Sequence, residues 1–163
     1  MGALSSEDWE GAARIYEAGI AGGNATFEPC APSWEEWSRT RAGHPALVAR
    51  DERERMLGWA ALGPTSSRPC YQGVGEVSIY VDPPCARRGV GRTLLGALIA
   101  ASERDGFWTL KAGIFPENAA SIALHERCGF ELVGVSRRIG QMPDGRWRDV
   151  AFYERRSPVV GAQ

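Results

Sequence analysis

Arg87-Arg88-Gly89-Val90-Gly91-Arg92-Thr93-Leu94-Leu95 is the stretch that decides the fold of this chain. It follows a run of strand character, residues 74–81, and opens a run of helical character. Two glycines at such a junction permit a tight turn and leave backbone N–H groups uncovered. The first N–H groups of a helix lack internal partners and carry partial positive charge. The junction therefore predicts a phosphate or pyrophosphate site, to which the three arginines add full charges.

A second block begins about 30 residues later, running from Asn118 through Ser121 to Gly129-Phe130. In this order and spacing the two blocks resemble the acetyl-CoA site of the GNAT superfamily of N-acetyltransferases. That family's pattern is Gln/Arg-x-x-Gly-x-Gly/Ala, followed by an Asn-x-x-Ser/Ala helix that ends in Gly-Phe. Gly89 and Gly91 match it, whereas Ala86 stands at the Gln/Arg position. Without the second block, the glycines indicate a structural turn equally well.

The resemblance implies acetyl-CoA as co-substrate and assigns its contacts. Backbone groups of Ile79, Tyr80 and Val81 would meet the pantetheine arm. Asn118, with Ser121, would face the cofactor near the thioester. The pyrophosphate would be wrapped by Arg87, Arg88, Gly89, Val90, Gly91 and Arg92.

Glu76 is the candidate general base, and it lies in the strand before the glycine turn. Strand alternation predicts two opposite faces, with Glu76, Ser78 and Tyr80 on one and Val77, Ile79 and Val81 on the other. We expect partial burial of this carboxylate, which would make it a stronger base for an amine that arrives as an ammonium. The alternative is a solvated glutamate with no catalytic role.

His125 lies in the second block, at the place where many superfamily members carry a tyrosine thought to protonate the leaving thiolate. The resemblance therefore implies a general acid. A histidine that is packed or on the helix surface is the alternative, because a lone histidine is a modest signal.

Further segments narrow the resemblance to phosphinothricin and methionine sulfone/sulfoximine acetyltransferases, from about Leu4 to Arg155. They are residues 24–28, 68–69, 76–81, 124–126 and 145–152. In that family the acceptor is the α-amino group of a small amino acid with a tetrahedral, oxygen-bearing side chain. The amine would attack the thioester directly, a backbone N–H between Val77 and Val81 would stabilise the oxyanion, and the protein would be a homodimer.

The same resemblance places the acceptor among Phe27, Glu28, Arg68, Pro69, Glu76, Val77 and Ser78. Arg68 would hold an anionic group of the acceptor through a bidentate pair, unless it is a solvated loop arginine. Phe27 and Trp147 are candidates for the pocket wall, and we favour core packing for Trp147. Cys70 replaces an aromatic residue of some relatives and puts the pocket's shape in doubt.

The composition limits the possible partners. The chain has 163 residues, 44% hydrophobic and 24% charged, with a formal net charge of −1. The charge argues against a nucleic-acid surface, and no apolar run approaches the roughly 20 residues of a membrane span. Its four cysteines are scattered, without metal-ligand spacing, and its N-terminus lacks signal-peptide character. We expect a cytoplasmic enzyme with a small-molecule acceptor and no metal.

The expected fold is α/β: a mixed, mostly antiparallel central sheet with helices on both faces. Helices are expected over 5–21, 33–43, 89–105 and 119–127, and strands over 46–50, 56–62, 74–81, 109–114, 130–136 and 149–154. Residues 1–163 form one domain, with an ordered core over about 3–156 and a loose tail from Ser157. Another amine acceptor, such as a protein N-terminus or an aminoglycoside, and a non-catalytic acyl-CoA-binding module remain the rival interpretations.

Overall fold

The computed structural model describes residues 1–161, which form one seven-stranded sheet in the order β1-β2-β3-β4-β5-β7-β6. Only β4 and β5 are parallel, and every other neighbouring pair is antiparallel. The strands are β1 (Gly2–Ala3), β2 (Ala46–Arg50), β3 (Met56–Pro64), β4 (Val74–Val81), β5 (Thr109–Ile114), β6 (Glu131–Gln141) and β7 (Trp147–Arg156). The expected mixed, mostly antiparallel sheet is confirmed.

The helices are α1 (Trp9–Ala21), α2 (Trp34–Thr40), α3 (Val90–Arg104) and α4 (Ala119–Arg127). Short 3₁₀ turns lie at η1 (Ser6–Asp8), η2 (Pro69–Tyr71) and η3 (Pro83–Cys85). The Ser33 hydroxyl accepts from the Glu36 N–H while the Glu36 carboxylate accepts from the Ser33 N–H, a capping box that begins α2.

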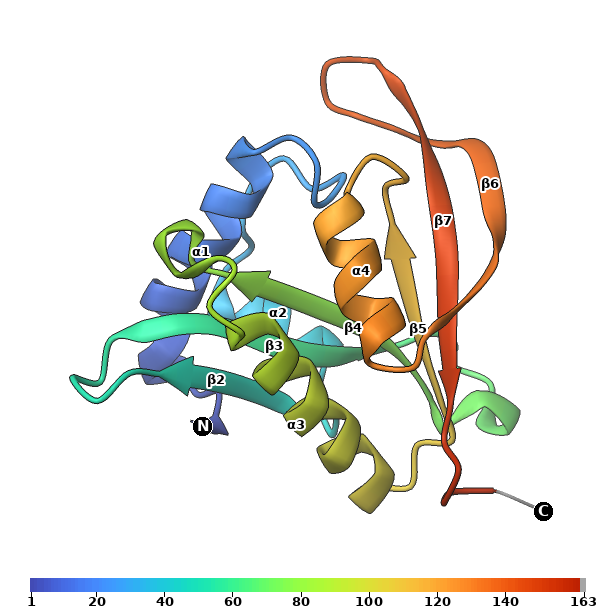
Figure 1. Ribbon diagram of the computed structural model, residues 1–163, viewed down its shortest axis with the longest axis horizontal. Helices are drawn as coiled ribbons and strands as arrows, with labels where there is room; N and C mark the ends of the chain where they lie inside the picture. The colour runs from blue at the N-terminus through green and yellow to red at the C-terminus, as the bar shows by residue number, and fades with distance from the viewer. Residues whose placement is uncertain (162–163) are drawn as a thin grey trace.

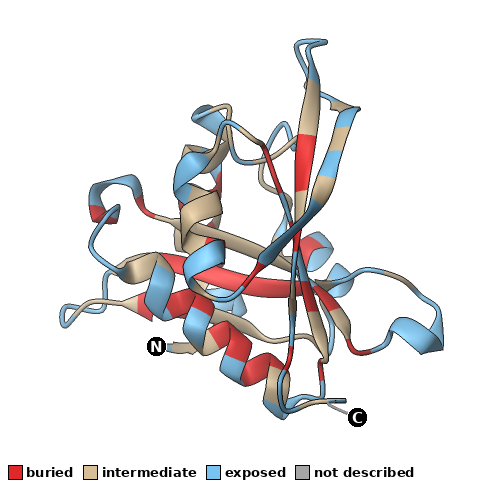
Figure 2. Ribbon diagram, turned by 45° about the vertical axis from the view of Figure 1, so that its right-hand side comes forward, coloured by how far each residue is buried: buried red, intermediate tan, exposed pale blue. Residues whose placement is uncertain are grey.

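Two hydrophobic cores lie on opposite faces of the sheet. Along β3, the fully buried Trp59 packs under α1 and α2, while Leu62 packs under α3. The buried side of α3 carries Leu94, Leu95, Leu98 and Ile99, as the spacing predicted. Figure 2 shows this buried stripe of α3 facing the sheet. Helices therefore cover both faces, as expected.

The parallel pairing of β4 with β5 is short. The two strands pair only from Val74↔Thr109 to Glu76↔Lys111. Beyond Glu76 they diverge, and α4 and the loop after α1 stand on either side of the gap (Figure 1). Helix α3 is the crossover that connects these two parallel strands. The glycine turn lies between the end of β4 and the start of this helix.

The C-terminal part differs from expectation. The last two strands reach further than predicted, to Gln141 and from Trp147, and form a long hairpin (Figure 1). Ser157 is not part of a loose tail: it is buried, its N–H donates to Trp108 O at 2.9 Å, and its hydroxyl donates to Glu103 Oε1 at 3.0 Å. Residues 162 and 163 of the expected tail lie outside the described residues. Within residues 1–161, no helix combines the length and apolarity needed to cross a bilayer.

Candidate active site

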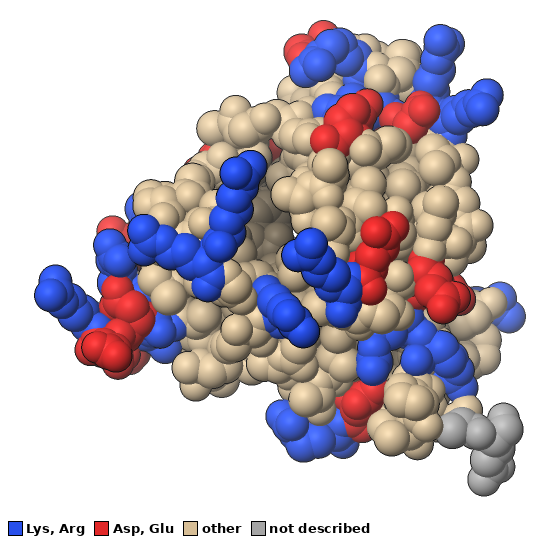
Figure 3. Space-filling model, viewed as in Figure 1, with Lys and Arg blue, Asp and Glu red and all other residues tan. Residues whose placement is uncertain are grey.

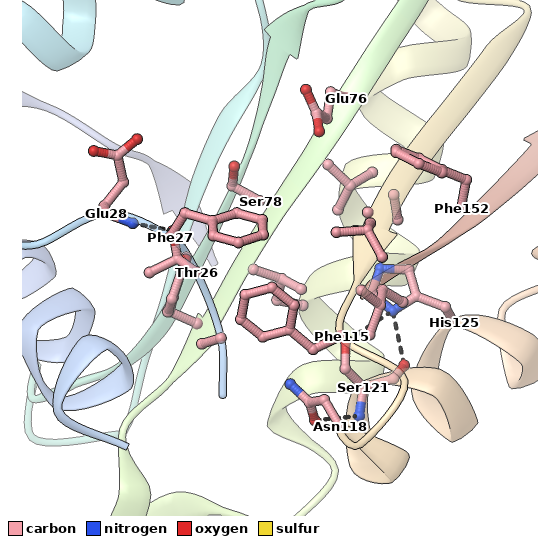
Figure 4. Close-up of a pocket in the computed structure, with 18 of the residues that line it drawn as sticks. Thr26, Phe27, Glu28, Glu76, Ser78, Phe115, Asn118, Ser121, His125 and Phe152 are labelled. Carbon is pink, nitrogen blue, oxygen red and sulfur yellow. Dashed lines mark hydrogen bonds between the residues drawn. The ribbon is translucent and has the colours of Figure 1, made fainter. Parts of the chain in front are cut away.

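A cavity of about 530 Å³ occupies the gap where β4 and β5 diverge. Its walls come from residues 76–80 of β4, residues 112–114 of β5 with Phe115 directly after it, and residues 25–28 of the loop after α1. Helix α4 and the β6/β7 hairpin complete them. Figure 4 shows Glu76 and Ser78 projecting from β4 toward Phe27, with Asn118, Ser121 and His125 coming from the side of α4. The chain thus brings together residues more than 100 positions apart in sequence, such as Thr26 and Val150.

All five residues 76–80 of β4 line the cavity, and of these Val77 and Ile79 also pack against the α3 core. The expected partial burial of Glu76 is wrong, since this residue is exposed. The reason is that β4 loses its neighbour directly after Glu76, so the carboxylate stands at the open mouth of the cavity. An amine bound there can lose its proton to this carboxylate directly or through water.

Phe27 forms part of the cavity wall, and its position is set by two contacts. Its ring lies edge-on to Phe115, with centroids 4.9 Å apart. It also packs so closely on Gly140 that an added Cβ there would lie 2.5 Å from the ring. The β6/β7 hairpin therefore closes against the loop that carries Phe27 and Glu28.

His125 is buried at 2% exposure and lies edge-on to Phe130. Its Nδ1 lies 2.8 Å from Ser121 O, which can only accept, so we assign the proton to Nδ1. Nε2 then carries a lone pair, and it has no partner among the described residues. Burial lowers the pKa of the imidazole, only partly opposed by the bond to Ser121. The neutral ring can accept a hydrogen bond but has no Nε2 proton to donate, which weakens the expected general-acid role.

Asn118 is the N-cap residue of α4 and also connects this helix to the loop after α1. Its Oδ1 accepts from the Ser121 N–H at 3.1 Å, and its Nδ2 donates to Asn24 O at 2.9 Å. The side chain therefore caps the helix and anchors the loop that leads to Phe27. Both Asn118 and Ser121 line the cavity.

The start of α3 has the features of an anion site. Gly89 takes a left-handed conformation, φ 82°, and Thr93 N–H donates the first intrahelical bond to Gly89 O. The N–H groups of residues 90–92 thus have no partner within the helix. Arg87, Arg88 and Arg92 are exposed around this turn. Basic side chains gather below and beside the hollow in this face (Figure 3).

Gly91 also has a packing role that the sequence did not reveal. A Cβ at this position would lie 3.1 Å from the Leu124 side chain of α4. A bulky residue there would push α3 away from α4, in addition to crowding the N–H groups of the turn.

The structure does not bring Arg68 or Pro69 into the cavity. Both are exposed and lie at η2, before the paired start of β4, where the Arg68 guanidinium lies 5.7 Å from the Tyr71 ring. Cys70 belongs to the same turn, so its departure leaves the cavity's shape unaltered. Core packing of Trp147 is wrong: it is 57% exposed, because it lies on the hairpin beyond the helical layers.

Arg41 is the charged residue of the cavity that sequence reasoning missed. It follows α2 and lines the cavity together with Glu28 and Glu76. Tyr16 and Tyr80 lie beside it, with ring centroids 4.6 Å apart. Burial raises the pKa of both phenols, so they stay neutral at physiological pH.

Comparison with known proteins agrees with this geometry. Residues 9–130 match the model of the acetyltransferase (GNAT) family. The chain is 39% identical over 117 residues to an L-methionine sulfoximine/L-methionine sulfone acetyltransferase of Pseudomonas paraeruginosa, covering 72% of this chain and 67% of the relative. It is 36% identical over 160 residues to a phosphinothricin N-acetyltransferase of Alcaligenes faecalis, covering 93% and 79%. A crystal structure of a phosphinothricin acetyltransferase from Sinorhizobium meliloti in complex with AcCoA superposes with a TM-score of 0.89 at 32% identity, covering 99% and 90%.

Proposed function

Since the chain belongs to the acetyltransferase (GNAT) family, we propose that it acetylates the α-amino group of a small amino-acid-like acceptor of the phosphinothricin, methionine sulfoximine or methionine sulfone type. It is an acetyl-CoA-dependent N-acetyltransferase. The observation that supports the acceptor site is the exposed Glu76 carboxylate at the mouth of the cavity between the diverging strands.

The residues around the gap fit acetyl-CoA. When bound, it supplies an activated acetyl group as a thioester. The free N–H groups of residues 90–92 and the exposed Arg87, Arg88 and Arg92 suit its pyrophosphate. Beyond Glu76, β4 has no ladder partner on the β5 side, so its backbone groups there are available to the pantetheine arm.

We assign proton removal from the acceptor to Glu76. The carboxylate reaches the cavity from β4, while Glu28 brings a second negative charge from the loop after α1. Two carboxylates favour an acceptor that arrives as an ammonium, and an exposed carboxylate passes its proton to water readily. In its neutral form, His125 presents Nε2 as a hydrogen-bond acceptor rather than as an acid.

An acceptor panel tests this function. Release of the CoA thiol is measured with phosphinothricin, methionine sulfoximine, methionine sulfone, a neutral amine of similar size, spermidine and a peptide N-terminus. The three amino acids should give a kcat/KM roughly tenfold or more above the others, since one specific polar contact is worth about that much. Glu76→Gln should lower kcat on the best acceptor by roughly 10² to 10⁴, the usual contribution of a positioned base.

Glu10→Gln, an exposed substitution on α1, is the matched control and should leave kcat unchanged. Equal activity on spermidine or the peptide would contradict the acceptor class. Wild-type turnover by Glu76→Gln would contradict the assignment of the base.

We also propose that the enzyme is a homodimer. Supporting this, β6 is an edge strand, and it exposes the apolar side chains of Leu132, Val133 and Val135, which a second copy can cover. Sedimentation equilibrium decides between this assembly and a monomer.

A further inference from the structure

Arg41 occupies an unusual electrostatic position. Its guanidinium lies 4.8 Å from the centre of the Trp37 ring, and its Nε is buried without a hydrogen-bond partner. The only hydrogen bond of this side chain within residues 1–161 is donated by Nη1 to Thr40 Oγ1, at 3.1 Å. No carboxylate of the described chain lies within 4.0 Å of it. A guanidinium has five N–H donors, so most of its capacity is unused.

The surroundings bury part of the Arg41 side chain but leave its charge unpaired. Burial lowers the pKa of the guanidinium, against the opposing influence of Tyr16, Tyr80, Glu76 and Glu28. Arginine nevertheless remains charged in proteins. A desolvated cation with unused donors is costly unless an anion arrives to meet it. The contact with the Trp37 ring holds the guanidinium at the cavity, and its fork of N–H donors suits a planar, two-oxygen partner.

The charges of the cavity divide into two parts. Glu76 and Glu28 suit an ammonium, and Arg41 is the one arginine or lysine that lines this cavity in the described chain. An α-amino acid carries an ammonium and a carboxylate on the same carbon. It therefore matches a cavity in which carboxylates and one arginine face the same space.

From this pairing we propose that Arg41 binds the α-carboxylate of the acceptor and thereby selects amino acids over simple amines. The inference rests on the proposed function. It gives Arg41 the role of anion binding that the sequence had suggested for Arg68. A planar carboxylate, rather than the tetrahedral side-chain group, is the partner because it fits the guanidinium fork through two parallel hydrogen bonds.

The test pairs two acceptors with three variants. Methionine sulfone is compared with 3-(methylsulfonyl)propan-1-amine, the same molecule without its carboxylate. Arg41→Gln should raise the KM for methionine sulfone about 10- to 100-fold and leave the KM for the amine unchanged, because the amine never makes the contact. Arg41→Lys keeps the charge but loses the fork, so its KM should lie between those of the wild type and Arg41→Gln.

Arg39→Gln is the matched control, since Arg39 lies on α2 two residues earlier, is exposed and does not line the cavity. It should leave both KM values unchanged. Calorimetric acetyl-CoA binding should be the same for all variants, which shows that each of them is folded. If Arg41→Gln does not fold, the wild type alone tests the inference. Its KM for methionine sulfone should then be about 10- to 100-fold lower than its KM for the amine.

Three outcomes would overturn the inference. These are an unchanged KM for methionine sulfone in Arg41→Gln, an equal rise for both acceptors, or a wild type that does not distinguish them. A wild type that acetylates the amine and the amino acid equally well refutes the role of Arg41 while acetyl transfer stands. A wild type that acetylates neither refutes the proposed acceptor class itself.

Discussion

His125 shows how a single buried residue can change its expected role. Its ring is held by one hydrogen bond to a backbone carbonyl, which places the proton on Nδ1. Nε2 is then unprotonated and has no hydrogen-bond partner among the described residues. Protonating Nε2 would place a charge in an apolar setting beside Phe130, and burial accordingly lowers the pKa of the ring. The side chain is therefore suited to accept a hydrogen bond in the cavity.

This state of His125 predicts both a spectroscopic and a pH signature. The chain has two histidines, so ring ¹⁵N spectra contain only two sets of signals. His125 should appear as the Nδ1–H tautomer and titrate below the ordinary value of about 6.5. Since the unfolded chain then binds the proton more readily, this residue should cost stability as the pH falls below about 6.5, and have no effect above it.

The measurement is the free energy of unfolding by urea at pH 5, 6 and 7. Below pH 6.5, the free energy of unfolding of the wild type should fall, relative to that of His125→Gln, by up to about 1.4 kcal/mol per pH unit. An Nε2–H tautomer, or a pH dependence identical in both proteins, would restore the general-acid interpretation.

At the scale of elements, Arg148 of β7 joins three segments beside the cavity. Its guanidinium donates to Gly23 O at 3.0 Å, Asn24 Oδ1 at 2.7 Å and Glu117 Oε2 at 2.9 Å. It also lies 4.0 Å from the centre of the Phe115 ring. The β6/β7 hairpin, the loop after α1 and the β5–α4 loop are thus held together by one side chain.

Arg148→Met should therefore loosen the loop that carries Phe27 and Glu28. We expect a loss of about 1 to 3 kcal/mol in the free energy of unfolding, because carbonyl and amide groups lose a charged donor. Glu117 is 64% exposed, so solvent screens its share of that loss. The acceptor KM should rise several-fold, while acetyl-CoA affinity should hold.

Urea unfolding and steady-state kinetics measure these effects, with Arg146→Met as the control. Arg146 pairs with Asp144 at the tip of the same hairpin, where its side chain is 65% exposed, so its loss should change stability by less than about 0.5 kcal/mol. Equal effects of the two substitutions would show that Arg148 is not the link.

Elements whose patterns are local were predictable from sequence. The helical spacing of Leu94, Leu95, Leu98 and Ile99 and the Ser33/Glu36 capping box describe α3 and the start of α2 correctly. The β6/β7 hairpin was predicted too short because alternation fades where both faces meet solvent. Most residues of β6 are accordingly exposed.

The cavity itself was only partly predictable. Glu76 and Ser78 follow from strand alternation and Asn118 from its motif, because each signal lies within one element. Arg41 gave no signal, since an arginine at the end of a short helix is usually solvated. The resemblance placed Arg68 at the acceptor, whereas it lies at η2, before the paired start of β4, and does not line the cavity.

Over the whole molecule, the two hydrophobic cores lie on opposite faces of one sheet, and within that sheet β4 and β5 stop pairing beyond Glu76. The cavity between these strands is lined by α4 and the β6/β7 hairpin on one side and by the loop after α1 on the other. A ligand that fills this gap adds contacts to segments that Arg148 and Asn118 already link, so binding should stabilise the entire fold.

Acetyl-CoA should accordingly raise the melting temperature of the whole chain. At a ligand concentration 100 times the Kd, the gain is about 2.7 kcal/mol, or a shift of roughly 5 to 11 °C for a domain of this size. Replacing Arg88 and Arg92 by alanine should leave the melting temperature of the free protein almost unchanged, because both side chains are exposed. The same double variant should bind acetyl-CoA about tenfold more weakly, which removes about 1.4 kcal/mol of the ligand-induced gain at the same concentration. Differential scanning calorimetry with and without acetyl-CoA measures both quantities. A ligand-induced shift that survives the double substitution in full would place the pyrophosphate away from the start of α3.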